Sequence, residues 1–217
     1  MAIANPKEKT NVSYGEFSIG DVKAQFKLQL NEGQDFFAAA ALAVVSPLLR
    51  ETLAENVALA LAISTEKARS ELIIAPVLVE IRRQAGRKIS LFSGVEFTVD
   101  PAQGLNGVCD YLLSLSPEQL TVEAPVVTVV EAKNDNLKAG LGQCIAEMVA
   151  ARLFNQRCGR DIAQVFGAVT TGSLWKFMAL AGDIVSLDLR EYHISEVERI
   201  VGILVHMVQK NPPLPSA

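Results

Sequence analysis

The stretch Val126-Val127-Thr128-Val129-Val130-Glu131-Ala132-Lys133 decides our expectation of the fold. Its unbroken run of β-branched residues is typical of a strand that is buried on both faces. The run then ends in a carboxylate and an ammonium group two positions apart. Successive side chains of a strand alternate between its faces, so Glu131 and Lys133 point the same way. Because a buried charge requires a partner or a metal ion, the end of this strand is a candidate functional site.

The composition is that of a folded protein with room for a sizeable core. The chain has 217 residues, of which 50% are hydrophobic and 20% charged, so one domain is expected. The net charge of −4 argues against nucleic-acid binding through bulk charge, but it allows a local basic groove. The three cysteines, which have neither zinc-ligand nor disulfide spacing, are Cys109, Cys144 and Cys158.

Hydrophobic patterns predict where the chain forms strands and helices. The expected strands are residues 21–30, 89–99, 107–115, 121–132, 164–170, 174–180 and 184–189, and the expected helices are residues 46–63, 66–84, 141–155 and 195–209. A local disturbance is expected at Pro76, and residues 134–142 are expected to be a loop. This order predicts an α/β fold with a central mixed β-sheet flanked by helices.

The domain organisation follows from the same patterns. Residues 1–63 are expected to form an N-terminal elaboration, a strand plus a helix, that packs on a core at residues 64–210. Residues 211–217 are expected to be a frayed tail. No stretch reaches the roughly 20 apolar residues that a membrane span needs, and the N-terminus lacks the apolar centre of a signal peptide. We therefore expect a cytoplasmic protein with no membrane partner.

The carboxylates suggest phosphodiester chemistry. Asp110 lies within an apolar run upstream of the opening stretch, and Mg²⁺ in proteins is commonly bound by one or two carboxylates. We expect Asp110, Glu131 and the carbonyl of Ala132 to bind Mg²⁺, with Mn²⁺ as a substitute. Lys133 is expected to orient or help deprotonate the attacking water. Two simpler interpretations stay open: Glu131 and Lys133 form an ordinary ion pair, and Asp110 belongs to a turn.

These residues resemble the PD-(D/E)XK nuclease superfamily. Its pattern is an acidic residue in the second core strand, followed by acid-any-Lys on the third. Gly107-Val108-Cys109-Asp110 matches the first part, although Cys109 stands where the pattern has proline, and Glu131-Ala132-Lys133 matches the second.

The resemblance extends to the flanking helices and covers residues 64–190. Many members carry a glutamine on the helix after the sheet, which Gln143 matches, and a glutamate on the helix before it. Thr65-Glu66-Lys67-Ala68 and the segment at residues 167–177 are similar to the nuclease domain of type I restriction enzyme subunits. Glu66 is thus the first choice for the helix glutamate, with Glu71 and Glu80 as alternatives.

The resemblance implies a restriction-endonuclease-like core and a Mg²⁺-dependent endonuclease that hydrolyses nucleic acid, DNA rather than RNA. Lys133, Gln143 and Glu66 would be its catalytic side chains. The alternative is a catalytically silent protein of the same fold that binds nucleic acid or another protein. The apolar face of the last helix (200–208) is compatible with a homodimer or with the core. Two interpretations stay open for a set of basic residues: they contact phosphates, or they merely face solvent. These residues are Arg82, Arg83, Arg87, Lys88 and Lys138.

Overall fold

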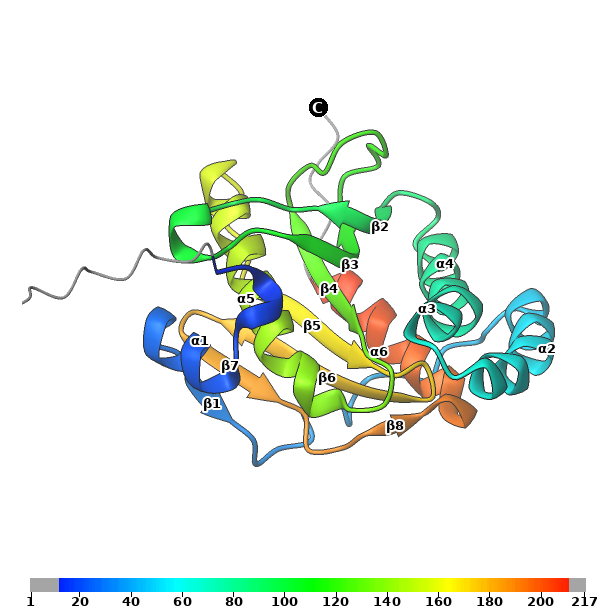
Figure 1. Ribbon diagram of the computed structural model, residues 1–217. Coiled ribbons are helices and arrows are strands. Elements are labelled where there is room, and N and C mark those ends of the chain that lie inside the picture. Colours follow the sequence, from blue (N-terminus) through cyan, green and yellow to red (C-terminus); the bar gives the residue numbers. More distant parts are fainter. Residues whose placement is uncertain (1–11, 211–217) are drawn as a thin grey trace, which may run out of the picture.

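A single mixed β-sheet forms the centre of the computed structural model, which describes residues 12–210 (Figure 1). The eight strands of this part are β1 (Gln29–Asn31), β2 (Ser90–Glu96), β3 (Val108–Ser114), β4 (Val126–Ala132), β5 (Val165–Thr170), β6 (Leu174–Ala181), β7 (Ile184–Leu187) and β8 (Tyr192–His193). They lie in the order β1-β7-β6-β5-β4-β3-β2, with β8 paired to β6. β4 is parallel to β5 and β1 to β7, whereas the other pairs are antiparallel.

Helices cover both faces of the sheet. The α-helices are α1 (Ile19–Phe26), α2 (Pro47–Ile63), α3 (Glu66–Arg69), α4 (Ala75–Gln84), α5 (Leu137–Arg157) and α6 (Val197–Lys210). One apolar cluster joins α1 and α5 to the sheet, and a second joins α2, α4 and α6 to its other side (Figure 1). This confirms the expected α/β class. The apolar face of α6 is thereby buried in the core. Within the described residues, no helix is both long and apolar enough to cross a membrane.

The expectation of a strand at residues 21–30 is wrong, because residues 19–26 form α1. Ser18 caps this helix: its hydroxyl accepts a hydrogen bond from the Asp21 N–H, and the Asp21 carboxylate accepts one from the Ser18 N–H at 2.9 Å. This reciprocal capping starts a helix at the point where the alternating pattern begins. Val22 and Phe26, one turn apart, then pack toward α5. The only strand in this segment is the short β1.

The helical segment before the sheet contains a wide turn at residues 70–74, between α3 and α4. Pro76 has no N–H to donate to the carbonyl of Leu72, so the regular helical hydrogen bond cannot form there. The side chain of Asn56 on α2 donates to that carbonyl instead, at 3.1 Å. The expected disturbance at Pro76 is therefore present: the regular α-helical pattern is interrupted at residues 70–74, but the helix continues into α4.

The expected loop at residues 134–142 is mostly helix. Asn136 caps α5 with its side chain, which accepts a hydrogen bond from the Lys138 N–H at 3.0 Å. Gly142 lies in the first turns of α5, where a Cβ atom would be 2.2 Å from the carbonyl oxygen of Phe17. The absent side chain lets the N-terminal segment lie directly on α5. The expectations for residues 1–11 and for the tail at 211–217 fall outside the described residues.

Candidate active site at the end of strand β4

The sheet brings Asp110 and Glu131 to the same level on neighbouring strands. β3 and β4 are antiparallel, and Tyr111 lies opposite Val130. Continuing this register by one residue brings Asp110 on β3 opposite Glu131 on β4. The carboxylate of Asp110 accepts a hydrogen bond from the Ala132 N–H at 2.8 Å. β4 lies in the middle of the sheet and all its residues are buried. The two acidic side chains are therefore held by rigid backbone.

Glu131 is buried against a single cation. Its side chain is 1% exposed and forms an ion pair with the Nζ of Lys133, which is 22% exposed. The other oxygen of Glu131, Oε2, is buried and has no hydrogen-bond partner among the described residues. A carboxylate oxygen without a partner is costly to bury, so this atom is a natural ligand position for a cation.

The electrostatics of the pair reflect an excess of negative charge. Burial and the Asp110 carboxylate raise the pKa of Glu131 to about 8, against the opposing effect of Lys133. Burial favours the neutral form of Lys133, but the Glu131 carboxylate outweighs it and raises the pKa of the lysine. Lys133 is thus held as an ammonium group. A second cation beside Asp110 and Glu131 would lower the pKa of Glu131 and relieve the repulsion.

The donor set fits Mg²⁺ in chemistry. Asp110, Glu131 and the Ala132 carbonyl offer only oxygen atoms, which is what this ion prefers. Among residues 12–210, no three side chains of His, Cys, Asp and Glu form a ready-made metal cluster. The expected set needs only two such side chains, since its third ligand is a backbone carbonyl.

A chain of hydrogen bonds connects Lys133 to the interior of α5. The Nζ of Lys133 donates to Oε1 of Gln143 at 3.3 Å, and Nε2 of Gln143 donates to Oε1 of Glu147 at 3.1 Å. Glu147 is fully buried, and burial followed by the charge of Glu131 raises its pKa well above the usual value. Gln143, which the resemblance assigns to the helix after the sheet, thus lies within hydrogen-bond distance of Lys133. It reaches Lys133 from the second turn of α5.

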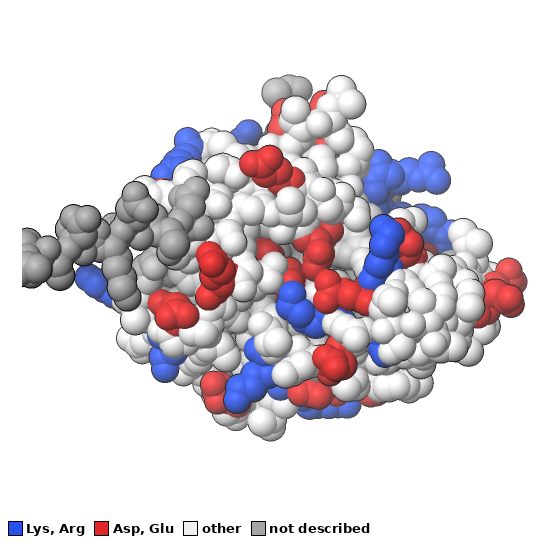
Figure 2. All heavy atoms as spheres, in the orientation of Figure 1, with Lys and Arg blue, Asp and Glu red and all other residues white. Residues whose placement is uncertain are grey.

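A cavity of about 260 Å³ opens beside these residues. Its lining comes from α3, the wide turn after it, β2, β3 and the end of β4, and consists of Glu66, Lys67, Ser70, Glu71, Ser93, Gly94, Asp110, Tyr111 and Ala132. Tyr111 closes one side of it, because its hydroxyl donates to the Ser70 carbonyl at 3.0 Å. Figure 2 shows acidic side chains gathered near the middle of this face, where the sheet meets α3.

Of the three glutamates considered for the helix position, Glu66 is the best placed. It lines the cavity with Asp110, and its charge acts on both Glu131 and Lys133. Glu71 lines the same cavity but is paired with Lys67 at 2.8 Å. Glu80 is buried elsewhere, where it accepts hydrogen bonds from Ser46, Arg83 and Gln84.

Glu147 was not anticipated from the sequence. The available signal was its spacing: residues 143 and 147 are one helical turn apart and share a face, and Glu147 is the only acidic residue of α5. A lone acid in a helix that is buried on more than one side needs a polar partner, and Gln143 provides it.

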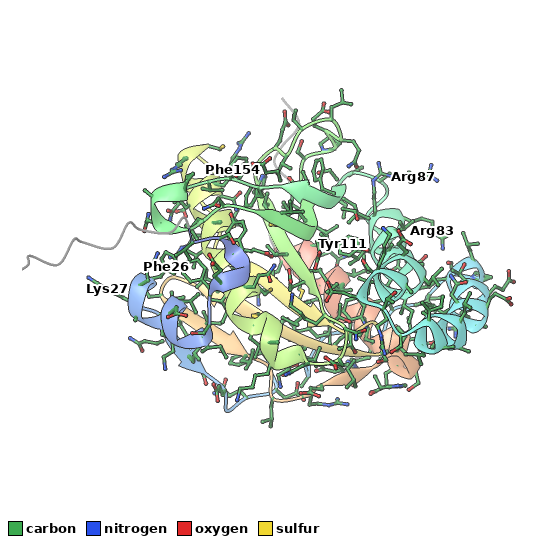
Figure 3. All side chains as sticks on the ribbon, in the orientation of Figure 1. Phe26, Lys27, Arg83, Arg87, Tyr111 and Phe154 are labelled. Carbon is green, nitrogen blue, oxygen red and sulfur yellow. The ribbon has the colours of Figure 1, made fainter. Side chains whose placement is uncertain are left out.

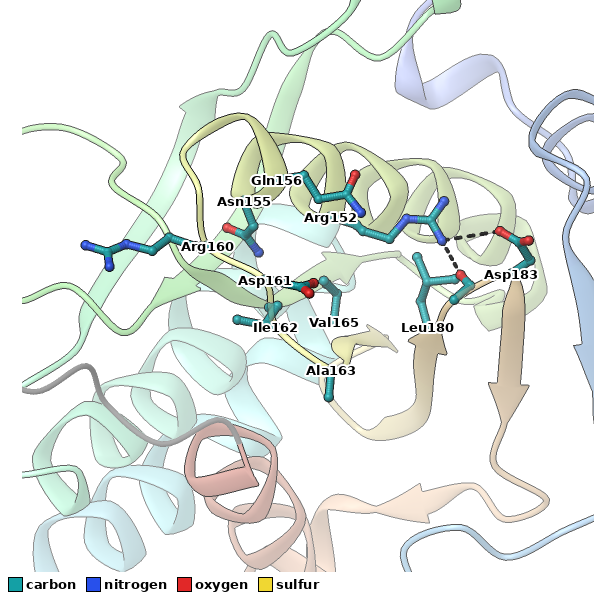
Figure 4. Close-up of a pocket in the computed structure, with 11 residues that line it drawn as sticks. Arg152, Asn155, Gln156, Arg160, Asp161, Ile162, Ala163, Val165, Leu180 and Asp183 are labelled. Atoms are coloured by element: carbon teal, nitrogen blue, oxygen red, sulfur yellow. Dashed lines mark hydrogen bonds and ion pairs between the residues drawn. The ribbon is translucent and has the colours of Figure 1, made fainter.

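A polar cavity of about 440 Å³ lies at the opposite end of the central strands (Figure 4). Two of its polar side chains, Asn155 and Arg152, are bonded to the protein itself. Asn155 bonds both the N–H and the carbonyl of Val126, at 2.8 and 2.7 Å, and Arg152 bonds the Gly182 carbonyl and lies 3.7 Å from Asp183. These contacts hold the start of β4 and the β6–β7 turn, so this cavity is a structural feature.

In comparisons with known proteins, no family model and no curated protein matches this sequence.

Proposed function

We propose that the protein is a Mg²⁺-dependent nuclease of the restriction-endonuclease-like type, which hydrolyses phosphodiester bonds of DNA. The observation that carries the proposal is the pairing of two acidic residues on adjacent central strands with a lysine bonded to one of them. An ion pair with Lys133 leaves Oε2 of Glu131 buried without a partner in the described part of the chain, and a bound cation would supply one.

Each side chain has a role in this reaction. A divalent cation held by Asp110, Glu131 and the Ala132 carbonyl would neutralise charge on the phosphoryl oxygens. Lys133, kept as an ammonium group, orients the attacking water and stabilises the negative charge that develops on the phosphoryl group. Gln143 fixes the Nζ of Lys133 from α5. Hydrolysis joins the water oxygen to phosphorus, breaks the bond to the leaving oxygen and transfers a proton to that oxygen.

The test is cleavage of supercoiled plasmid and of single-stranded DNA, with Mg²⁺, Mn²⁺ or EDTA. We expect cleavage that requires either ion and that falls by about 100-fold or more in Lys133→Ala, the magnitude typical of removing one electrostatic stabiliser. Lys23→Ala, which changes an exposed lysine on α1, is the matched control and should cleave normally.

Two results would contradict the proposal. Cleavage that persists undiminished in Lys133→Ala would show that the activity belongs to another mechanism or to a contaminant. DNA binding by the wild-type protein without any cleavage would favour the catalytically silent alternative. The homodimer remains a separate proposal, which light scattering on the purified protein tests.

A further inference from the structure

A second, larger groove lies between α2 and α4. Its volume is about 760 Å³, and the aliphatic residues of its lining include Leu48, Ala75, Pro76 and Val79. Leu48 is 65% exposed and Val79 is 57% exposed. Solvent-exposed aliphatic side chains that gather in one hollow commonly mark a binding surface.

One end of this groove is cationic. Arg82, Arg83 and Arg87 line it, and Figure 3 shows Arg83 and Arg87 near one another at the end of α4. Arg83 is neutralised by Glu80, with Nη2 and Oε2 2.6 Å apart. Neither Arg82 nor Arg87 is paired with a carboxylate within residues 12–210. A chain with a net charge of −4 thus has a local excess of positive charge here.

The groove adjoins the candidate active site. Glu71 lines both the groove and the 260 Å³ cavity that contains Asp110 and Glu66. A polymer bound in the groove can therefore extend past Glu71 to the carboxylates. The Lys67 ammonium, 2.8 Å from Glu71, neutralises the acidic charge at this junction.

We propose that the groove between α2 and α4 binds unpaired nucleotides of a single-stranded DNA segment and leads the strand into the active site. The proposal rests on the proposed nuclease function. Unpaired bases expose apolar faces that fit Leu48, Pro76 and Val79, while Arg82 and Arg87 attract the phosphates. A duplex fits poorly, because its base faces are stacked inside and only its phosphates and groove edges are exposed. An acidic amphipathic peptide would match the apolar lining and the positive charge of the groove, but it would not account for the groove lying next to the proposed phosphodiester site, with Glu71 lining both.

The experiment measures fluorescence anisotropy of a short labelled oligodeoxythymidine, and of a labelled duplex, with the full-length protein in EDTA. We expect the single strand to bind more tightly than the duplex. Arg87→Ala should weaken single-strand binding by about fivefold and reduce the slope of log K against log salt by about 0.7, the value for one phosphate contact on a single strand. Arg87→Lys should restore most of the affinity, and Val79→Asp should weaken binding at least as much as Arg87→Ala.

Arg160→Ala is the matched control, since Arg160 is exposed in the distant polar cavity. The affinity of this variant for the single-stranded oligonucleotide should be unchanged. Equal binding of single strand and duplex, or unchanged affinity in both Arg87→Ala and Val79→Asp, would overturn the proposal. The proposal would also be overturned if the protein bound a helical peptide rich in leucine and glutamate but did not bind the oligonucleotide. Because no cleavage occurs in EDTA, loss of this binding and loss of nuclease activity are separate results.

Discussion

Glu147 is an acidic residue buried in the interior of α5. It is fully buried and accepts a hydrogen bond from the Gln143 amide, while its Oε2 has no hydrogen-bond partner within residues 12–210. An ionised carboxylate in that position would lack the compensation it needs. Burial raises the pKa of Glu147 and so favours its neutral form. Its Oε1 accepts the hydrogen bond of the Gln143 amide, whose own Oε1 in turn faces Lys133.

We predict that Glu147→Gln makes stability less sensitive to pH. In the unfolded chain the carboxyl releases its proton above its usual pKa of 4.5, whereas the raised pKa in the folded protein retains the proton to a higher pH. The stability that this proton contributes is thus present at low pH and is lost as pH rises toward the folded-state pKa, by up to about 1.4 kcal/mol per pH unit. In urea unfolding between pH 5 and pH 8, the free energy of unfolding of Glu147→Gln should rise relative to that of the wild type as the pH increases.

The exposed control Glu55→Gln on α2 should follow the wild type across the same pH range. A stability difference between Glu147→Gln and wild type that does not change with pH would show that Glu147 is ionised in the folded protein. Cleavage by Glu147→Gln should stay near the wild-type level, because the new amide can still accept the hydrogen bond from Gln143.

The sequence predicted those residues of the candidate site whose position follows from strand geometry. Glu131 and Lys133 share a face because of the two-residue period, and the hydrophobic runs placed Asp110 on the strand before them. The roles of Gln143 and Glu66 came from resemblance alone. Glu147 could not be assigned, because its partner depends on how deeply α5 packs against the sheet, and that is set by contacts such as Gly142 with Phe17.

Among the elements, β4 depends on a side chain far from its functional end. The amide of Asn155, 1% exposed on α5, bonds both the N–H and the carbonyl of Val126 at the first residue of β4. Asn155→Ala would leave both backbone groups buried without partners. We expect it to lower the free energy of unfolding by about 2 kcal/mol or more, measured by urea denaturation.

The adjacent Gln156→Ala, which changes an exposed residue, should have almost no effect on stability. Equal stability of Asn155→Ala and Gln156→Ala would mean that the start of β4 is held by the sheet alone. Any folded Asn155→Ala protein should retain cleavage, because Glu131 and Lys133 lie at the other end of the strand.

Hydrophobic periodicity gave the wrong element in the segment that forms α1. Residues 21–30 alternate between apolar and polar, yet residues 22 and 26 also satisfy the helical spacing of four, and the Ser18–Asp21 capping box selects the helix. The strands β2 to β7 were predicted to within about five residues at each end. Their short apolar runs are bounded by Gly, Pro and Asp turn residues, and β4 in particular is a run of β-branched residues with no competing helical pattern. β8 is too short to leave a periodic signal.

For the whole molecule, the N-terminal part is not an optional addition to the core. Within residues 12–63, apolar side chains enter both clusters: Tyr14, Phe17, Val22 and Leu28 pack on the α5 side, and Phe37, Val45, Leu49 and Leu53 on the α6 side. β1 pairs in parallel with β7, from Gln29 opposite Ile184 to Asn31 opposite Ser186. The same segment contributes Leu48 and Thr52 to the proposed DNA groove.

We therefore predict that residues 64–210, which carry every proposed catalytic side chain, do not fold stably without residues 12–63. Their removal would expose apolar surface on both sides of the sheet and leave β7 as an open edge, and burial of such surface is the main source of stability. Thermal unfolding followed by circular dichroism should show no cooperative transition for this fragment, whereas a chain beginning at residue 12 should unfold cooperatively. A cooperative, cleavage-competent fragment would show instead that the catalytic unit is smaller than the fold, and that the N-terminal part serves substrate binding alone.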